Sequence, residues 1–223
     1  MEKKKYDDHF VPAGGRLLQQ SVLKHIRRKG DGVLEGAAIG YDAAIFQNGN
    51  NCIVQTTGVQ PTGRVPEAYP LTAGELAWIT ADNQLATCGA VPVSMQVLLV
   101  AGTGCEEEII RREMQKLAKT ASEKACPITG GNTVYFGDAE DCLVQLVVTG
   151  EPDRELSLGR RKPAAGDRVF FLGETGMLGA DLLVKAGRER LLRRFSESYL
   201  RTMEAAPEDF SVRAAACAAL KVP

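Results

Sequence analysis

The 223-residue sequence has the composition of a folded protein, and its charge argues against several functional classes. Its residues are 44% apolar and 25% charged, which is enough to bury one core and part of a second. The formal net charge is −1 with both signs intermixed, so we expect no nucleic-acid partner. The N-terminus is charged, and no apolar run approaches the ~18 residues of a membrane span, so we expect a cytoplasmic protein without an export signal.

The six cysteines form neither a metal-binding nor a disulfide pattern. No two are spaced as C-x-x-C, and the two histidines, His9 and His25, lie far from most of them in the sequence. Most of the cysteines occur in apolar runs, where a thiol behaves as a small apolar side chain. Cys105 opens a predicted helix, so a reactive thiol stays open as an alternative there.

The first sixty residues predict a helix followed by a hairpin. Apolar residues recur at helical spacing over 16–26, directly after the glycine pair Gly14-Gly15. Two β-type runs, 43–46 and 52–57, are separated by a segment that contains Asn48-Gly49, a dipeptide typical of tight hairpin turns. We therefore expect these two strands to pair antiparallel.

Helices and strands alternate from residue 72 to residue 148. Thr72 and Glu75 have the spacing of a capping box, which marks the start of a helix. Thr103 and Glu106 repeat that spacing before a second amphipathic run. The predicted elements are helix 73–88, strand 93–100, a second helix ending near residue 125, a glycine turn over 128–133 and strand 142–148. This order predicts an α+β fold in which helices cover one face of a mixed or antiparallel sheet.

A second structural unit is predicted after a polar, basic linker over 151–166. Its elements are a strand over 167–172, a glycine-rich turn over 173–179, a helix opening at 180–185, and helices over 188–204 and 211–220. A glycine turn before a helix can bind an anion through backbone N–H groups, although a tight turn explains the same pattern. One strand is too few to complete a sheet, so residues 167–223 are predicted to be a truncated α+β domain.

Four segments together resemble a known superfamily, that of aminoimidazole ribonucleotide (AIR) synthetase, selenophosphate synthetase, thiamine-monophosphate kinase and the carbamoyl-dehydrating hydrogenase maturation factor. The segments are Gly40-Tyr41-Asp42-Ala43-Ala44-Ile45, residues 82–92, Ile128-Thr129-Gly130-Gly131-Asn132-Thr133, and residues 173–182. Gly14-Gly15-Arg16-Leu17-Leu18 also resembles the hydrogenase-maturation branch. That branch acts through a C-terminal cysteine, whereas this sequence ends Lys221-Val222-Pro223, so we do not expect its activity.

The resemblance implies a nucleotide-binding domain over residues 1–150 and a homodimer. In this superfamily two such domains build a shared β-barrel, ATP lies near the interface, and aspartates hold Mg²⁺ against the phosphates. Asp42 is then the predicted metal ligand. The predicted nucleotide- and phosphate-binding residues are Asp42, Thr57, Asn83, Gln84, Thr129, Gly130, Gly131 and Asn132.

The sequence departs from the superfamily at four positions where a carboxylate is usual. The neutral residues there are Tyr41, Thr57, Gln84 and Asn132. Amides and hydroxyls supply no negative charge, so we expect a weakened Mg²⁺ site. Asp82 would substitute only partly for the carboxylate missing at Gln84, because two residues along a helix turn a side chain through about 200°.

Two functions therefore remain open at this point. The first is an ATP-dependent enzyme domain that activates an amide or carbonyl oxygen by phosphorylation. The second is a catalytically degenerate, dimeric binding or scaffold homologue without ATP turnover. Asp138, Glu140 and Asp141 are alternative metal donors, although a solvated loop explains them more simply. The acceptor substrate is not predicted.

Overall fold

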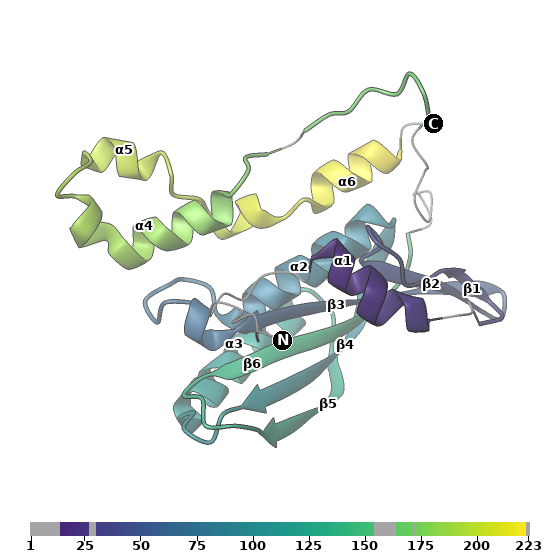
Figure 1. The fold of residues 1–223 in the computed structure, drawn as a ribbon, viewed down its shortest axis with the longest axis horizontal. Coiled ribbons are helices and arrows are strands. Elements are labelled where there is room, and N and C mark those ends of the chain that lie inside the picture. The colour runs from purple at the N-terminus through teal and green to yellow at the C-terminus, as the bar shows by residue number, and fades with distance from the viewer. Residues whose placement is uncertain (1–13, 27–29, 154–163, 172, 222–223) are drawn as a thin grey trace.

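The body of the molecule is a six-stranded mixed sheet (Figure 1). The computed structural model describes residues 14–26, 30–153, 164–171 and 173–221. In spatial order the strands run β1-β2-β3-β6-β4-β5, and every neighbouring pair is antiparallel except β4 and β5, which are parallel. The strands are β1 (Val33–Glu35), β2 (Ala43–Asn48), β3 (Asn51–Pro61), β4 (Ala90–Ala101), β5 (Ile128–Tyr135) and β6 (Cys142–Pro152). The predicted α+β class and the β2–β3 hairpin are confirmed.

Helix α2 (Ala73–Thr87) lies directly on the sheet and forms the centre of the core. Its first turn has the predicted capping box, with the Thr72 hydroxyl accepting from the backbone N–H of Glu75 and the Glu75 carboxylate accepting from that of Thr72. A Cβ atom placed at Gly58 of β3 would lie 1.9 Å from the carbonyl oxygen of Ala77. A side chain at position 58 would therefore push α2 off the sheet.

Helix α3 (Glu107–Glu123) packs beside α2, and both contribute side chains to one apolar core. Alternate residues of β6 face this core, as the pleat of a strand requires. The buried Glu113 of α3 accepts a 2.8 Å hydrogen bond from the backbone N–H of Gly74, which ties α3 to the first turn of α2. The largest fully buried apolar side chains of the body are Ile45, Leu85, Met95, Leu117, Leu146, Val54, Val144 and Val148.

Two predictions for the body were wrong in detail. The expected glycine turn over 128–133 is the first part of strand β5. Gly131 takes a φ of +150°, and a Cβ there would lie 1.8 Å from the carbonyl oxygen of Val97, so glycine permits the close parallel pairing with β4. Thr103 does not cap α3, because its hydroxyl donates to the carbonyl of Gly137 and the helix begins at Glu107 without a side-chain cap.

The N-terminal segment is helical where predicted, but its helix is irregular. α1 (Gly15–Leu17) continues as a π-type turn over Leu18–Val22 and a 3₁₀ turn over Leu23–His25. None of these residues is buried, so packing does not select one regular helical form.

The C-terminal arm, which we define as residues 164–221, forms a layer on the outer side of α2 (Figure 1). Its helices are α4 (Met177–Leu191), α5 (Glu197–Arg201) and α6 (Arg213–Leu220), and a 3₁₀ turn at Pro207–Phe210 precedes α6. The predicted single helix over 188–204 was wrong, because the chain leaves α4 after Leu191 and Ser196 caps a separate α5.

The strand predicted over 167–172 is absent from the described part of that segment. Residues 167–171 form no strand, and Val169, Phe170 and Phe171 are 97%, 84% and 74% exposed. The pattern was apolar enough for a strand, but the described chain places no neighbouring strand beside it. Residue 172 and most of the predicted linker, residues 154–163, lie outside the described residues.

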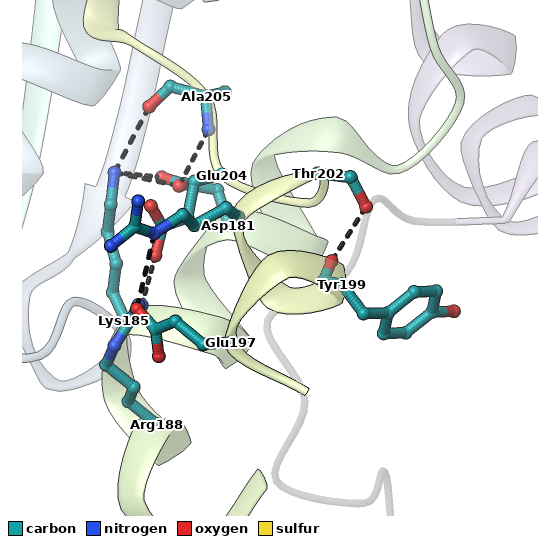
Figure 2. Close-up of polar contacts among 9 residues, drawn as sticks. Asp181, Lys185, Arg188, Glu197, Tyr199, Thr202, Glu204 and Ala205 are labelled. Carbon is teal, nitrogen blue, oxygen red and sulfur yellow. Dashed lines mark hydrogen bonds and ion pairs between the residues drawn. The ribbon is translucent and has the colours of Figure 1, made fainter. Parts of the chain in front are cut away.

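A buried carboxylate anchors the arm to the body. The fully buried Asp181 of α4 receives hydrogen bonds from the Tyr69 hydroxyl, from Lys185 Nζ and from the backbone N–H of Ala205 at 3.0 Å. Figure 2 shows Lys185 and Ala205 converging on this carboxylate, with Arg188 paired to Glu197 and Glu204 beside it. Because Tyr69 belongs to the body, Asp181 joins the two parts of the molecule.

Within the described residues, none of the helices has the length and apolarity needed to cross a bilayer.

Candidate functional site

The start of β2 and the middle of β3 form a small pocket of about 230 Å³. Its walls are Gly36, Ala37, Tyr41, Asp42, Ala43, Ala44, Gln55, Thr56, Thr57 and Val147. Asp42 is the one carboxylate among these lining residues, and they include no lysine or arginine. The site therefore offers hydroxyls, an amide and a single negative charge.

The buried hydroxyl of Thr56 joins three elements behind this pocket. It lies 2.7 Å from the main-chain carbonyl oxygen of Asp42 and also contacts the side-chain amide oxygen of Gln84 on α2, so its single hydrogen is shared between these two acceptors. The hydroxyl therefore holds the residue before β2, strand β3 and helix α2 together. Asp42 and Thr57 line this pocket, whereas Gln84 contacts Thr56 from the α2 side of β3 and is not among the lining residues.

Asn83 points away from this pocket, although we predicted it as a site residue. Its Nδ2 donates to the carbonyl oxygen of Phe210 at 2.8 Å, and its Oδ1 accepts from the backbone N–H of Val212 at 2.9 Å. One helical residue turns a side chain through about 100°, so Asn83 and Gln84 face different partners. Asn83 contacts the C-terminal arm.

Asp82 is also committed to the arm. Its carboxylate is paired with the guanidinium of Arg213, with 2.9 Å between Nε and Oδ2. The prediction that Asp82 substitutes partly for a missing metal ligand is therefore wrong for this conformation, because its charge is already neutralised by an arginine.

The remaining predicted residues, Thr129, Gly130, Gly131 and Asn132, lie on β5 at the far edge of the sheet. Strands β3, β6 and β4 separate β5 from β2, which places the two groups roughly 19 Å apart at ~4.8 Å per strand. Asn132 Oδ1 accepts from the backbone N–H of Thr133 at 2.9 Å, and Thr129 Oγ1 donates to the carbonyl of Met95 at 3.2 Å. One copy of the chain does not bring the two groups together.

The described residues contain no cluster of three or more metal-ligating side chains. Asp42 alone could contribute to a magnesium site at the pocket. Glu140 and Asp141 line a separate cavity of about 750 Å³ together with Glu106, Glu108 and Arg112. That cavity lies away from Asp42, so these carboxylates add nothing to the predicted metal site.

The reactive-thiol alternative at Cys105 has no support in the structure. The side chain is 8% exposed, and α3 begins two residues later, at Glu107. Burial raises the pKa of the Cys105 thiol, and the nearby Asp141 and Glu106 carboxylates raise it further. A thiol in this environment stays protonated and is a poor nucleophile.

Sequence reasoning missed Thr56, which makes the central contact of the site. We selected its neighbour Thr57 because the superfamily usually has an aspartate at that position. The strand pattern contained a signal, since Thr56 lies on the same face of β3 as the buried Val54. A polar residue on a core face needs a hydrogen-bond partner, and that requirement points to Thr56.

The comparison with protein families agrees with this geometry. Residues 40–151, half of the chain, match the family model described as AIR synthase related protein, N-terminal domain. The chain therefore belongs to the AIR synthase related family and carries its N-terminal domain. The matched region contains all eight predicted site residues, from Asp42 to Asn132.

Individual relatives are similar to this chain at modest identity. A putative hydrogenase expression/formation protein of Methanocaldococcus jannaschii is 24% identical over 177 residues, which is 77% of this chain and 52% of the relative. The carbamoyl dehydratase HypE of Rhodobacter capsulatus is 29% identical over 118 residues, 51% of this chain and 34% of the relative. The chain thus spans about half or less of the length of these curated relatives.

A solved structure supports the fold assignment. The structure of AaThiL complexed with AMPPCP and TMP superimposes with a TM-score of 0.57 at 22% identity, covering 90% of this chain and 63% of that one. At this identity the similarity shows the AIR synthase-like fold alone.

Proposed function

We propose that this chain binds ATP at the pocket around Asp42 and belongs to the branches of its family that activate an amide or carbonyl oxygen by ATP-dependent phosphorylation. The observation that carries the proposal is the Thr56 hydroxyl, whose single hydrogen is shared between the main-chain carbonyl oxygen of Asp42 and the side-chain amide oxygen of Gln84. These contacts bring the first two motifs of the family together beside the pocket, although three of the usual carboxylate positions, Tyr41, Thr57 and Gln84, are neutral. The AMPPCP bound by AaThiL, which shares the fold, is an analogue of ATP.

The charge of the pocket argues that binding requires a divalent cation. A triphosphate carries several negative charges, and Asp42 adds another, while the lining residues include no lysine or arginine. Mg²⁺ is commonly held by one or two carboxylates together with the phosphates themselves. Asp42 meets that minimum, so the proposed site is a magnesium site with fewer anionic ligands than is usual in the family.

The size of the pocket favours a site that a second copy completes. A cavity of about 230 Å³ falls below the ~300–1,000 Å³ typical of small-molecule sites, so one chain encloses only part of a nucleotide. The glycine strand β5 is exposed at the far edge of the sheet. In the proposed homodimer, β5 of one copy contributes Gly130, Gly131 and Asn132 beside Asp42 of the other, within a shared β-barrel.

The same proposal covers the domain organisation. Residues 1–150 form the nucleotide-binding domain, residues 151–166 a linker, and residues 167–223 part of a C-terminal domain. The sheet body ends with β6 at Pro152, close to the proposed boundary. The acceptor substrate is left unassigned.

Calorimetric titration with ATP, with and without Mg²⁺, tests the proposed function on protein whose mass in solution has been measured. We expect binding only with Mg²⁺, and we expect Asp42→Asn to weaken it at least tenfold because the last carboxylate of the pocket is lost. Glu189→Gln is the control, since it removes an exposed carboxylate of α4 outside the pocket. Absence of binding in both conditions would reject the ATP site and leave the degenerate binding homologue.

Gln84→Glu measures how far the metal site has been weakened. Glutamate has the same length, still accepts from Thr56, and adds a negative charge near Asp42. We expect the Mg²⁺ concentration needed for half-maximal ATP binding to fall several-fold, because hard cations prefer carboxylate oxygens. An unchanged Mg²⁺ requirement would place Gln84 outside the metal site.

A further inference from the structure

The contact between Arg213 and α2 is more extensive than an ordinary surface ion pair. Arg213 Nε lies 3.0 Å and 2.9 Å from the two carboxylate oxygens of Asp82, and its NH2 group also pairs with that carboxylate. The guanidinium donates further to the main-chain carbonyl oxygens of Asp82 and Ala90, each at 3.2 Å. The side chain of Asp82 is 15% exposed and that of Arg213 is 26% exposed, so the pair is largely shielded from water. A bidentate pair in such a setting is specific in geometry.

Asn83 makes a second attachment directly beside the first. Its amide donates to the carbonyl of Phe210 and accepts from the N–H of Val212, so it forms hydrogen bonds with the backbone on both sides of Ser211. The pairing resembles a short piece of β-ladder made by one side chain. Together, Asp82 and Asn83 fix the segment from Phe210 to Arg213 onto α2.

The next residue of α2 is Gln84. Its side chain points away from the arm and contacts Thr56 on β3. Residues 82, 83 and 84 therefore occupy a single turn whose outer side contacts the arm and whose inner side contacts Thr56, a residue that lines the pocket. The turn lies near the C-terminal end of α2, which stops at Thr87. Helix ends fray unless neighbouring groups hold them.

We propose that residues 207–221 act as a latch on α2, and that the docking of this latch through Arg213 and Asn83 is coupled to ligand binding at the Asp42 pocket through Gln84 and Thr56. The part of this inference that concerns nucleotide rests on the proposed function. A docked latch holds the last turn of α2 in place. That turn positions Gln84 against Thr56, which also contacts the main chain of Asp42. The coupling is positive, since an ordered pocket loses less conformational entropy when a ligand binds.

Coupling of this kind is reciprocal and has a measurable size. If latch docking raises nucleotide affinity by some factor, nucleotide must favour the docked latch by the same factor. Allosteric couplings in proteins typically correspond to about 5–150-fold in affinity. We expect at least the lower end of that range, because the path from Arg213 to Asp42 consists of an ion pair at Asp82, two residues of the α2 backbone, and the contacts of Thr56 with Gln84 and with the main chain of Asp42.

Arg213→Ala tests the latch, with Arg201→Ala as its matched control. Arg201 also forms an ion pair in the arm, with Glu197, and within the described residues it forms no ion pair with α2. For both variants the measurements are ATP affinity with Mg²⁺ and amide hydrogen exchange of the nucleotide-free protein. We expect Arg213→Ala to speed exchange over 207–220 and to weaken ATP at least fivefold, while Arg201→Ala changes neither.

A charge swap distinguishes coupling from general damage. Asp82→Arg combined with Arg213→Asp restores an ion pair of reversed polarity, although it loses the bonds to the carbonyls of Asp82 and Ala90. We expect the double variant to recover part of the lost affinity, whereas each single variant stays weak. Equal loss in the double variant and the two single variants would contradict the latch.

The remaining outcomes separate the latch from the ATP site. Should the unsubstituted protein bind no ATP, the proposed function fails, and the latch is judged on exchange alone: Arg213→Ala must then speed exchange around Asp42 and Thr56 as well as over 207–220. Faster exchange confined to 207–220, with the pocket and its affinity unchanged, would overturn the coupling. Unchanged exchange over 207–220 would show that Arg213 does not hold the latch.

Discussion

The sheet body and the C-terminal arm are held together by different kinds of interaction. The body buries more than twenty apolar side chains in a core between the sheet and helices α2 and α3. In the described residues of the arm, Val184 and Leu200 are the only fully buried apolar side chains, and the fully buried polar residue is Asp181. Apolar burial therefore builds the body, whereas the arm is positioned by oriented polar contacts through Asp181 and Arg213 together with apolar contacts of Leu178 and Leu182 on the core.

Truncating the core of the body has the largest expected effect. Leu146 is fully buried in β6, and Leu146→Ala leaves a cavity that costs about 2–5 kcal/mol of unfolding free energy. Urea unfolding followed by the fluorescence of Trp78, the single tryptophan, measures this loss in the body. Leu183→Ala on the arm is the control, because Leu183 is 71% exposed and should cost little. A loss below about 1 kcal/mol for Leu146→Ala would contradict a core-built body.

Breaking the Asp181 anchor should release the arm and leave the body folded. Asp181→Ala removes the acceptor for Tyr69, Lys185 and the N–H of Ala205, and losing one partner of a buried pair costs about 3–5 kcal/mol. We expect faster hydrogen exchange over 177–205 with little change in the Trp78 transition. Glu189→Ala, at an exposed position of the same helix, is the control. Joint unfolding of arm and body would show that they form one cooperative unit.

Acid should loosen the arm through the same carboxylate. Burial on its own raises the pKa of Asp181, but the hydrogen bonds from Lys185, Tyr69 and Ala205 outweigh it and hold the pKa below its ordinary value. The stabilisation is therefore present above the unfolded pKa of about 4 and is lost as the pH falls through the lowered folded value. Exchange over 177–205 measured between pH 5 and 2.5 should rise in the unsubstituted protein, and Asp181→Asn should remove this pH dependence.

The thiols give the smallest effect and compare the two regions without destabilising either. Burial raises the pKa of Cys126 and of Cys142 in the body to about 11, so at pH 8 roughly one thiol in a thousand is ionised. Cys217 in the arm is half-buried. In a Cys52→Ser background, which removes the other half-buried thiol, a disulfide reagent should label Cys217 first. Equal labelling of the body cysteines would indicate that the body opens as readily as the arm.

The fold of the body was largely predictable because its signals are local. A capping box, a turn dipeptide and alternating apolar runs gave α2, the β2–β3 hairpin and β6. The errors occurred where a tertiary contact decided the outcome. The glycines of β5 resemble a turn, yet Gly131 is needed for close pairing with β4, and the apolar run over 167–171 resembles a strand but has no neighbouring strand in the described chain.

The sequence proposed members of the candidate site but could not predict their geometry. Motif resemblance selected Asp42 and Thr57, which line one pocket, and Gln84, which contacts Thr56 from the other face of β3; it gave no information on distances across the sheet, so the β5 residues were grouped with them. The same motif resemblance assigned a shared role to the neighbours Asn83 and Gln84. The helical rotation between neighbours sends Asn83 to the arm instead, and the partner segment lies about 127 residues later in the chain.

The contact of Gly58 with Ala77 gives position 58 an influence on several properties of the molecule. Helix α2 carries Gln84, which contacts the pocket-lining Thr56, and it carries Asp82 and Asn83, which contact the arm. The distance between α2 and the sheet is fixed where the helix meets Gly58. A single added methyl group there would shift ligand site and arm attachment together. A change in the distance between α2 and the sheet would therefore alter the ligand site and the attachment of the arm at the same time. During evolution, glycine at position 58 constrains both features together.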